Sequence, residues 1–139
     1  MRNLSRRVGL SAALGFGLVM PPWSSAQGKP TAVTVREGQP TVLNGKVQGY
    51  TGPSYLVHAE AGQKLQVSLQ KLKGSTLFNV YAPGVEPGQD AIFRGDVGGD
   101  VADLNVMQAG DYRIDLFQMR ASARRGAVTN FTLKIALQR

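Results

Sequence analysis

The chain has 139 residues, with 16 Lys and Arg against 9 Asp and Glu and a formal net charge of +7. Its 42% hydrophobic content and its length are those of one globular domain. It contains no cysteine, which excludes a disulfide framework, a thiolate metal site and a cysteine nucleophile.

Residues 1–26 have the pattern of a secretory signal peptide. Three arginines in the first seven residues precede a mostly apolar run at 8–20, and small residues lead to a predicted cleavage site after Ala26. Standard secretion fits better than twin-arginine export because Gly9 replaces the bulky residue expected after the arginine pair. No run approaches eighteen apolar residues, so we expect a periplasmic protein without membrane insertion.

Residues 27–139 are expected to form a single domain. Removing the first 26 residues, which carry three arginines and no acid, lowers the net charge from +7 to +4. Such mild basicity in an exported protein argues against a nucleic-acid partner. A domain of this size buries roughly 60 to 70% of its unfolded surface, so a core can form without disulfides.

The pattern after Thr31 alternates with the period of two that is typical of strands, and no convincing helix is present. Short alternating stretches punctuated by glycine predict an all-β fold, an antiparallel β-sandwich of about eight to nine short strands. The candidate strands are residues 32–36, 41–48, 54–59, 64–70, 77–82, 91–94, 102–106, 111–117 and 130–137.

Three of these strands carry a clear apolar face opposite a polar one. We expect their apolar faces to form the core and their polar faces to meet solvent. The predicted core residues are Leu65, Val67 and Leu69, then Tyr112, Ile114 and Leu116, and finally Phe131, Leu133, Ile135 and Leu137.

The segment 118–129, before the last strand, concentrates positive charge. It contains Arg120, Arg124 and Arg125 and no acid. Because hairpin loops usually take about two to five residues, its length predicts a projecting hairpin loop. Arginine grips carboxylates through a planar fork of donors, so the loop could probe an acidic cleft on another molecule. A plain solvated loop is the alternative.

Catalytic and metal-binding interpretations find little support. Ser54 and the single histidine, His58, would lie about 13 Å apart along one strand at ~3.3 Å per residue, too far to form a nucleophile and base. Four aspartates near the middle of the chain lack the calcium-loop spacing and are better explained as turn residues. We therefore expect no enzyme activity, no metal and no cofactor; the four aspartates are Asp90, Asp96, Asp100 and Asp103.

Several short pieces occur together in a characteristic order: Gly49-Tyr50, Ser54-Tyr55, residues 61–68, Pro83-Gly84, residues 109–112 and residues 118–124. With these pieces, the chain resembles the bacterial periplasmic inhibitors of g-type lysozyme over residues 31–137. Pre-peptidase C-terminal domains carry similar strand and glycine-turn pieces. The early Gly-Tyr combined with two arginines four residues apart is more specific to the inhibitors.

The resemblance implies a non-enzymatic β-sandwich that places loop side chains in the cleft of g-type lysozyme and blocks access to peptidoglycan. The family's inhibitory tyrosine and two arginines would correspond here to Tyr50, Arg120 and Arg124. Because Arg125 follows Arg124 directly, a shift of one residue would give the second arginine's role to Arg125.

Two other functions stay open at this point. A sandwich of the pre-peptidase type would bind cell-wall polymer or act as an accessory module. An unrecognised hydrolase would have to use His58 and the scattered acidic residues.

Overall fold

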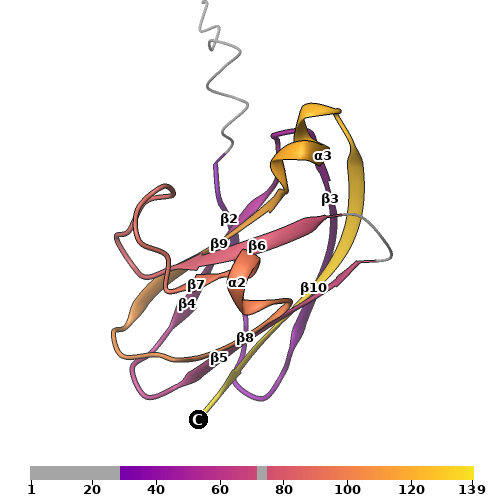
Figure 1. The fold of residues 1–139 in the computed structure, drawn as a ribbon. Coiled ribbons are helices and arrows are strands. Elements are labelled where there is room, and N and C mark those ends of the chain that lie inside the picture. Colours follow the sequence, from indigo (N-terminus) through magenta and orange to yellow (C-terminus); the bar gives the residue numbers. More distant parts are fainter. Residues whose placement is uncertain (1–28, 72–74) are drawn as a thin grey trace, which may run out of the picture.

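The computed structural model describes residues 29–71 and 75–139, and this part of the chain forms nine strands and two short helices (Figure 1). The predicted signal peptide, residues 1–26, lies outside the described residues. The elements are β2 (Thr31–Val33), β3 (Thr41–Gln48), β4 (Ser54–Ala59), β5 (Lys64–Lys71), β6 (Thr76–Tyr81), β7 (Phe93–Arg94), α2 (Gly95–Gly98), β8 (Val101–Asn105), β9 (Gly110–Gln118), α3 (Arg120–Arg124) and β10 (Val128–Gln138).

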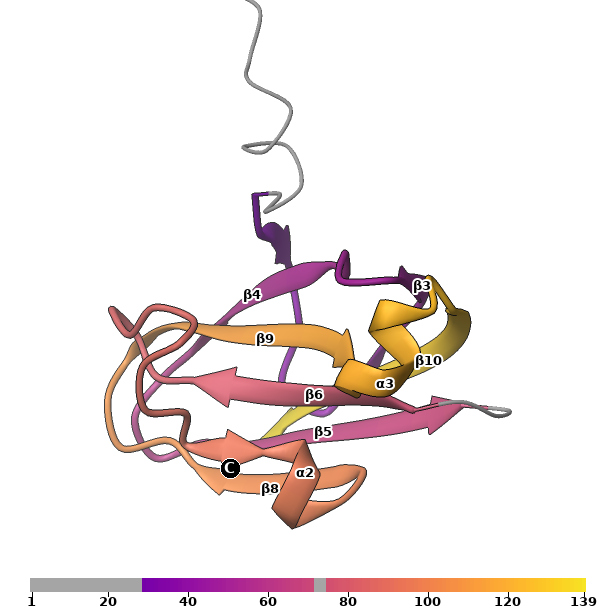
Figure 2. The same cartoon turned by 45° about the horizontal axis from the view of Figure 1, so that its top comes forward.

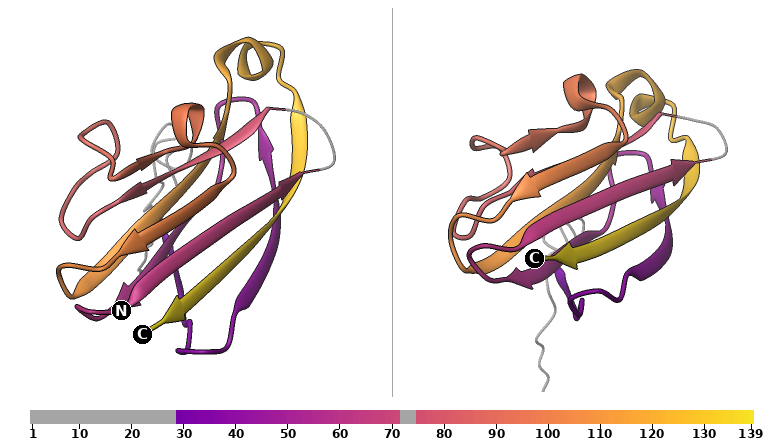
Figure 3. Two further views of the ribbon diagram at one scale, coloured as in Figure 1. Left: turned by 60° about the horizontal axis from the view of Figure 1, so that its bottom comes forward. Right: turned by 90° about the horizontal axis from the view of Figure 1, so that it is seen from below.

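The strands form two sheets that pack face to face, which confirms the predicted sandwich (Figure 3). One sheet has four strands in the order β3-β10-β5-β8, and the other has five in the order β2-β4-β9-β6-β7. The pairs are antiparallel except for β2 and β4, which run parallel. The prediction of purely antiparallel pairing is therefore wrong for this one pair. β2 lies at the edge of the five-stranded sheet beside β4, and β3 of the other sheet separates the two in sequence.

The core lies between the two sheets and is built from the predicted alternation. Each of the ten predicted core residues on β5, β9 and β10 is no more than 5% exposed. Polar residues between them, such as Lys134, point to solvent. A period of two places every second side chain on one face, so each sheet contributes one apolar face to the core.

The prediction of a hairpin between the last two strands is wrong. β9 pairs with β4 and β6, so both of its edges are occupied, whereas β10 pairs with β3 and β5 in the other sheet. Residues 119–127 therefore cross from one sheet to the other at one end of the sandwich. The segment is also not a helix-free loop, because it contains α3.

Leu133 tests the assigned core because it is fully buried on the central strand β10. We expect Leu133→Ala to lower the free energy of unfolding by about 3 kcal/mol, since it removes apolar contacts and leaves a cavity. Urea denaturation measures this change. Lys134→Ala, at the adjacent exposed position, should change stability by no more than about 0.5 kcal/mol. Equal effects of the two variants would contradict the assigned inner face.

Candidate functional site

The arginine-rich segment folds into a short helix with a defined end. Residues of good to moderate helix propensity fill α3, Arg120–Arg124, and Gly126 follows with φ 70°. Gly126 N–H donates to the Ala123 carbonyl at 3.0 Å, and Ala127 N–H donates to the Ser122 carbonyl at 3.1 Å. These two bonds are the Schellman motif, in which a glycine in the left-handed region ends a helix.

Contacts with Ser75, the residue before β6, hold α3 in place. Met119 N–H donates to the Ser75 carbonyl at 3.3 Å, and the Ser75 hydroxyl donates to Ser122 Oγ at 2.7 Å. Ala123 is the buried residue of the helix. The segment is thus an ordered crossover in the structure and not an unattached loop.

The three arginines differ in what their side chains do. Arg120 and Arg124 stand four residues apart on α3, which puts them on one side of the helix, and both are exposed. Arg125 lies just beyond the helix, and its guanidinium donates to the Ala121 carbonyl at 3.2 Å. Within the described residues, no hydrogen bond or ion pair engages the guanidinium of Arg120 or Arg124.

Tyr50 occupies a tight turn between β3 and β4. Gln48 and Thr51 exchange backbone hydrogen bonds of 2.9 and 2.8 Å across the turn. Gly49 has φ 58°, a conformation that glycine adopts at little cost. The Tyr50 side chain is 72% exposed, which is unusual for a large aromatic residue.

The fold brings this turn and the arginine segment together, although they are far apart in sequence. Gly49 N–H donates to the Ala127 carbonyl at 2.9 Å. Figure 2 shows α3 beside the end of β3 and the start of β10. Tyr50, Arg120, Arg124 and the tethered Arg125 therefore all belong to one end of the sandwich, which we call the arginine end.

A buried polar cluster lies directly beneath the arginine end. Among the described residues, four polar side chains are buried, and three of them, Thr76, Gln118 and Thr129, lie together here. The hydroxyls of Thr76 and Thr129 are hydrogen-bonded to each other and link β6 of one sheet to β10 of the other. The Gln118 amide donates to the carbonyls of Gly49 at 3.1 Å and Ala127 at 2.6 Å.

Sequence reasoning missed two features of this end. Gln118 continues the inward row of Tyr112, Ile114 and Leu116, so a polar residue at a core position was the signal that could have revealed it. Met119 is 55% exposed beside Arg120 and adds apolar surface to the same end. An exposed apolar side chain next to free guanidinium groups is a common composition for a protein-binding surface.

Comparison with known proteins identifies the family. No family model matches the chain. The crystal structure of Aeromonas hydrophila PliG, a periplasmic lysozyme inhibitor of g-type lysozyme, is similar with 37% sequence identity and a TM-score of 0.68, over 79% of this chain and 98% of that one. The chain belongs to the family of periplasmic inhibitors of g-type lysozyme.

More distant members of the inhibitor family are also similar. The inhibitor of g-type lysozyme from Escherichia coli K12 is 24% identical over 116 residues, which are 83% of this chain and 86% of that protein. Salmonella Typhimurium PliG is 22% identical with a TM-score of 0.59, over 78% of this chain and 99% of that one. A pre-peptidase C-terminal domain of Bacillus anthracis collagenase, 11% identical with a TM-score of 0.56 over 78% of this chain and 94% of that one, shares the fold alone.

Three of the four aspartates considered for calcium are paired with basic side chains in this inhibitor-family chain. Asp96 pairs with Arg94, Asp100 with Lys71 and Asp103 with Lys64, at 2.7, 3.4 and 3.9 Å. No three metal-ligating side chains gather in residues 29–71 and 75–139. The calcium interpretation thus gains no geometric support.

Among the described residues, none of the helices has the length and apolar character of a membrane span.

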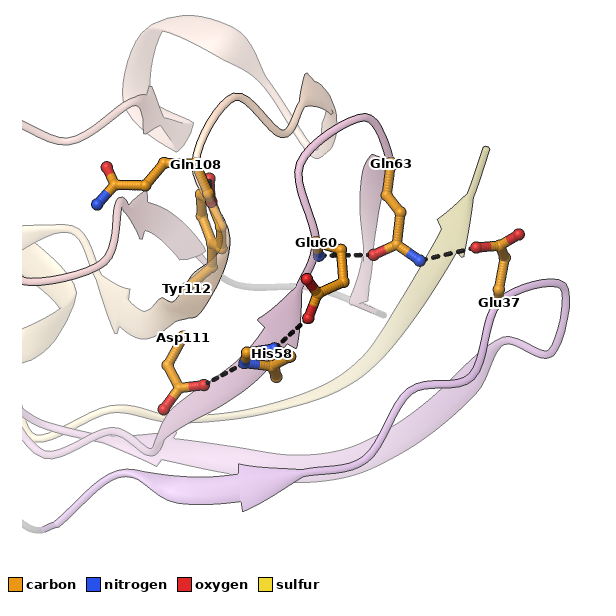
Figure 4. Close-up of polar contacts among 7 residues, drawn as sticks. All are labelled: Glu37, His58, Glu60, Gln63, Gln108, Asp111 and Tyr112. Carbon is orange, nitrogen blue, oxygen red and sulfur yellow. Dashed lines mark hydrogen bonds and ion pairs between the residues drawn. The ribbon is translucent and has the colours of Figure 1, made fainter.

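His58 lies between two carboxylates on the outer face of the five-stranded sheet (Figure 4). Its Nε2 is 2.6 Å from Glu60 Oε2, and its Nδ1 is 3.0 Å from Asp111 Oδ1 on the neighbouring strand. The hydrogen bond with Glu60 and then that with Asp111 raise the pKa of His58 above its usual 6.5. Ser54 instead donates to Asp115 at 2.5 Å, so the two residues form no nucleophile and base pair.

The raised pKa of His58 predicts a pH-dependent contribution to stability. A raised pKa in the folded protein means that the stabilisation is present below the unfolded value of 6.5 and is lost as pH rises through the folded value. We expect His58→Gln to lower the melting temperature more at about pH 5 than at about pH 9, as measured by circular dichroism. An equal loss at both pH values would contradict the carboxylate pairing.

Proposed function

We propose that this protein is an inhibitor of g-type lysozyme in the periplasm and acts through its arginine end. It is not an enzyme. The observation that carries the proposal is the meeting of an exposed tyrosine turn with two free arginines on one face of α3. Family membership supports g-type lysozyme as the target. The geometry supports the arginine end as the surface that binds it.

The chemistry of the target explains why arginines suit this task. Glycoside hydrolases cleave their substrates with carboxyl groups that flank the scissile bond. A guanidinium inserted into such a cleft can form two parallel hydrogen bonds with a carboxylate, and these bonds are strong where water is excluded. Arg120 and Arg124 would supply this interaction, and an occupied cleft would no longer admit peptidoglycan.

Tyr50 would add a different kind of contact. A tyrosine combines a large apolar ring with a hydroxyl that can be hydrogen-bonded, and such residues often dominate binding energy at interfaces. Its turn is short and closed by two backbone hydrogen bonds, so little backbone freedom would be lost on binding. α3, which is held by its Schellman motif and by Ser75, is similarly prepared for binding.

The two adjacent arginines have different roles in this proposal. Arg124 lies on the same side of α3 as Arg120, whereas Arg125 already donates to the Ala121 carbonyl. We therefore assign the second inhibitory position to Arg124. Arg125 would contribute positive charge near the cleft and support for the end of the helix.

A titration of the purified protein into g-type lysozyme tests the function. Lysis of bacterial cell walls is followed by turbidity, with hen-type lysozyme as the control enzyme. We expect stoichiometric loss of g-type activity. Full activity at micromolar excess would overturn the proposal, and cosedimentation with insoluble peptidoglycan in that case would favour the polymer-binding alternative.

Substitution of the two free arginines tests the surface. We expect Arg120→Ala or Arg124→Ala to weaken binding to g-type lysozyme by about 2 to 4 kcal/mol, because each removes one partner of a desolvated charge pair. Inhibition constants measure the loss, and melting temperatures should stay near that of the unchanged protein. Tyr50→Ala should weaken binding by about 2 kcal/mol.

Two further arginines serve as controls for that experiment. Arg125→Ala should raise the inhibition constant less than about fivefold, since its guanidinium is already engaged within the chain. Arg139→Ala removes an exposed arginine near Glu37 and should leave inhibition unchanged. Unchanged inhibition by the Arg120 and Arg124 variants would mean that another surface binds lysozyme.

A further inference from the structure

We propose that Gln118 is a positioning residue that fixes the tyrosine turn and the arginine segment relative to each other. This inference rests on the proposed function of that end. Gln118 is the last residue of β9, is 5% exposed and points into the space between the two sheets. From there its amide bonds to the tyrosine turn and to the end of the arginine segment at once.

The bonding pattern suits a primary amide at this position. Both contacts use Nε2, which donates to the Gly49 carbonyl at 3.1 Å and to the Ala127 carbonyl at 2.6 Å. These two carbonyls fix the orientation of the amide, because only its nitrogen can donate to them, and they leave Oε1 facing the Thr129 hydroxyl at 3.5 Å. A carboxylate of the same shape has no donors, and a thioether has none either, so neither glutamate nor methionine can replace the two bonds.

Each candidate binding residue lies close in sequence to Gln118 or to one of the two residues whose carbonyls accept its hydrogen bonds. Tyr50 follows Gly49, Arg120 lies two residues after Gln118, and Arg124 lies three residues before Ala127. Gly49 and Ala127 lie at the end of the β3–β10 ladder of the four-stranded sheet, because the neighbouring Gln48 and Val128 form its last pair, whereas Gln118 belongs to the five-stranded sheet.

The amide therefore links the two sheets, together with the Thr76–Thr129 pair, at the place where the arginines and the tyrosine emerge. The Gly49 N–H bond to Ala127 joins only the parts that belong to the four-stranded sheet. Without Gln118, the start of α3 would lose a direct connection to the tyrosine turn. Binding would then have to fix the positions of the arginine and tyrosine side chains, which the unchanged protein already holds in place.

The chain offers a matched control in Gln63, the fourth buried polar residue. Gln63 is 9% exposed, accepts from Glu60 N–H at 2.8 Å and donates to Glu37 at 2.8 Å. Figure 4 shows these contacts, which reach the His58 cluster through Glu60. They follow the end of β4 opposite to the one that the tyrosine turn precedes. Replacement by methionine removes two hydrogen bonds at Gln63, and at Gln118 it removes two together with the 3.5 Å contact to Thr129. Both side chains are buried, but only Gln118 supports the arginine end.

We expect Gln118→Met to raise the inhibition constant for g-type lysozyme on the order of tenfold to a hundredfold, because several side chains must then be ordered on binding. Gln63→Met should destabilise the protein to a similar extent and leave the inhibition constant within about threefold of the unchanged protein. Gln118→Leu is the second variant, because leucine continues the apolar row of β9 and is compatible with folding.

A double-mutant cycle separates positioning from general stability. In the Arg120→Ala background, Gln118→Met should cost less inhibition than it does alone, because part of its effect passes through that arginine and the rest through Tyr50 and Arg124. Fully additive effects, or an unchanged inhibition constant in a folded Gln118 variant, would overturn the inference. Similar losses of inhibition in the Gln63 and Gln118 variants would also overturn it.

Amide hydrogen exchange provides a readout that does not require lysozyme. Gln118→Met should speed exchange at Gly49 and Ala127 relative to the unchanged protein, whereas Gln63→Met should not. If the unchanged protein fails to inhibit but this difference appears, the proposed function fails while the positioning role stands. Equal exchange in all three proteins would overturn the positioning role itself.

Discussion

The arrangement of the arginine end follows from one constraint, that the chain must pass from one sheet to the other between β9 and β10. Strands of different sheets share no hydrogen-bond ladder, so backbone groups along the crossover need other partners. α3 satisfies part of this need within itself, and the side chain of Gln118 satisfies the carbonyls of Gly49 and Ala127. The polar contacts that close this end of the core are therefore also those that define the shape of the exposed surface.

The two ends of the sandwich consequently have different chemistry. At the arginine end, buried amide and hydroxyl groups support free guanidinium groups and an exposed tyrosine. Around His58, exposed charges are already paired with each other. A partner gains most from charges that the free protein leaves unpaired, because no internal bond must be broken first. The sandwich itself is a common scaffold, and its function depends on the segments that connect the strands.

The regular parts of the fold were predictable from local sequence, and the connections were not. β3 and β4 have the predicted bounds, and the inward rows of β5, β9 and β10 are buried, because a period of two is a local property of the sequence. The hairpin prediction failed because strand pairing depends on which edges are already occupied. The helix prediction failed although Gly126 follows a run of helix formers, a recognised stop signal. The arginines stood out from their concentration in one acid-free segment, whereas Tyr50 and the inhibitory roles came from family resemblance. The proximity of these residues depends on long-range contacts that no local pattern contains.

The position of β10 also determines when this surface can exist. β10 follows the other described strands in sequence but lies between β3 and β5, so the four-stranded sheet cannot assemble until Val128–Gln138 is available. Contacts between such distant segments form late and slowly, because long loops must close before they contribute. A chain in which β10 has not yet paired would thus carry the arginines and the tyrosine without their geometry. The arginine end could therefore bind a partner only after β10 has paired. Binding would then occur only in the compartment where folding is completed.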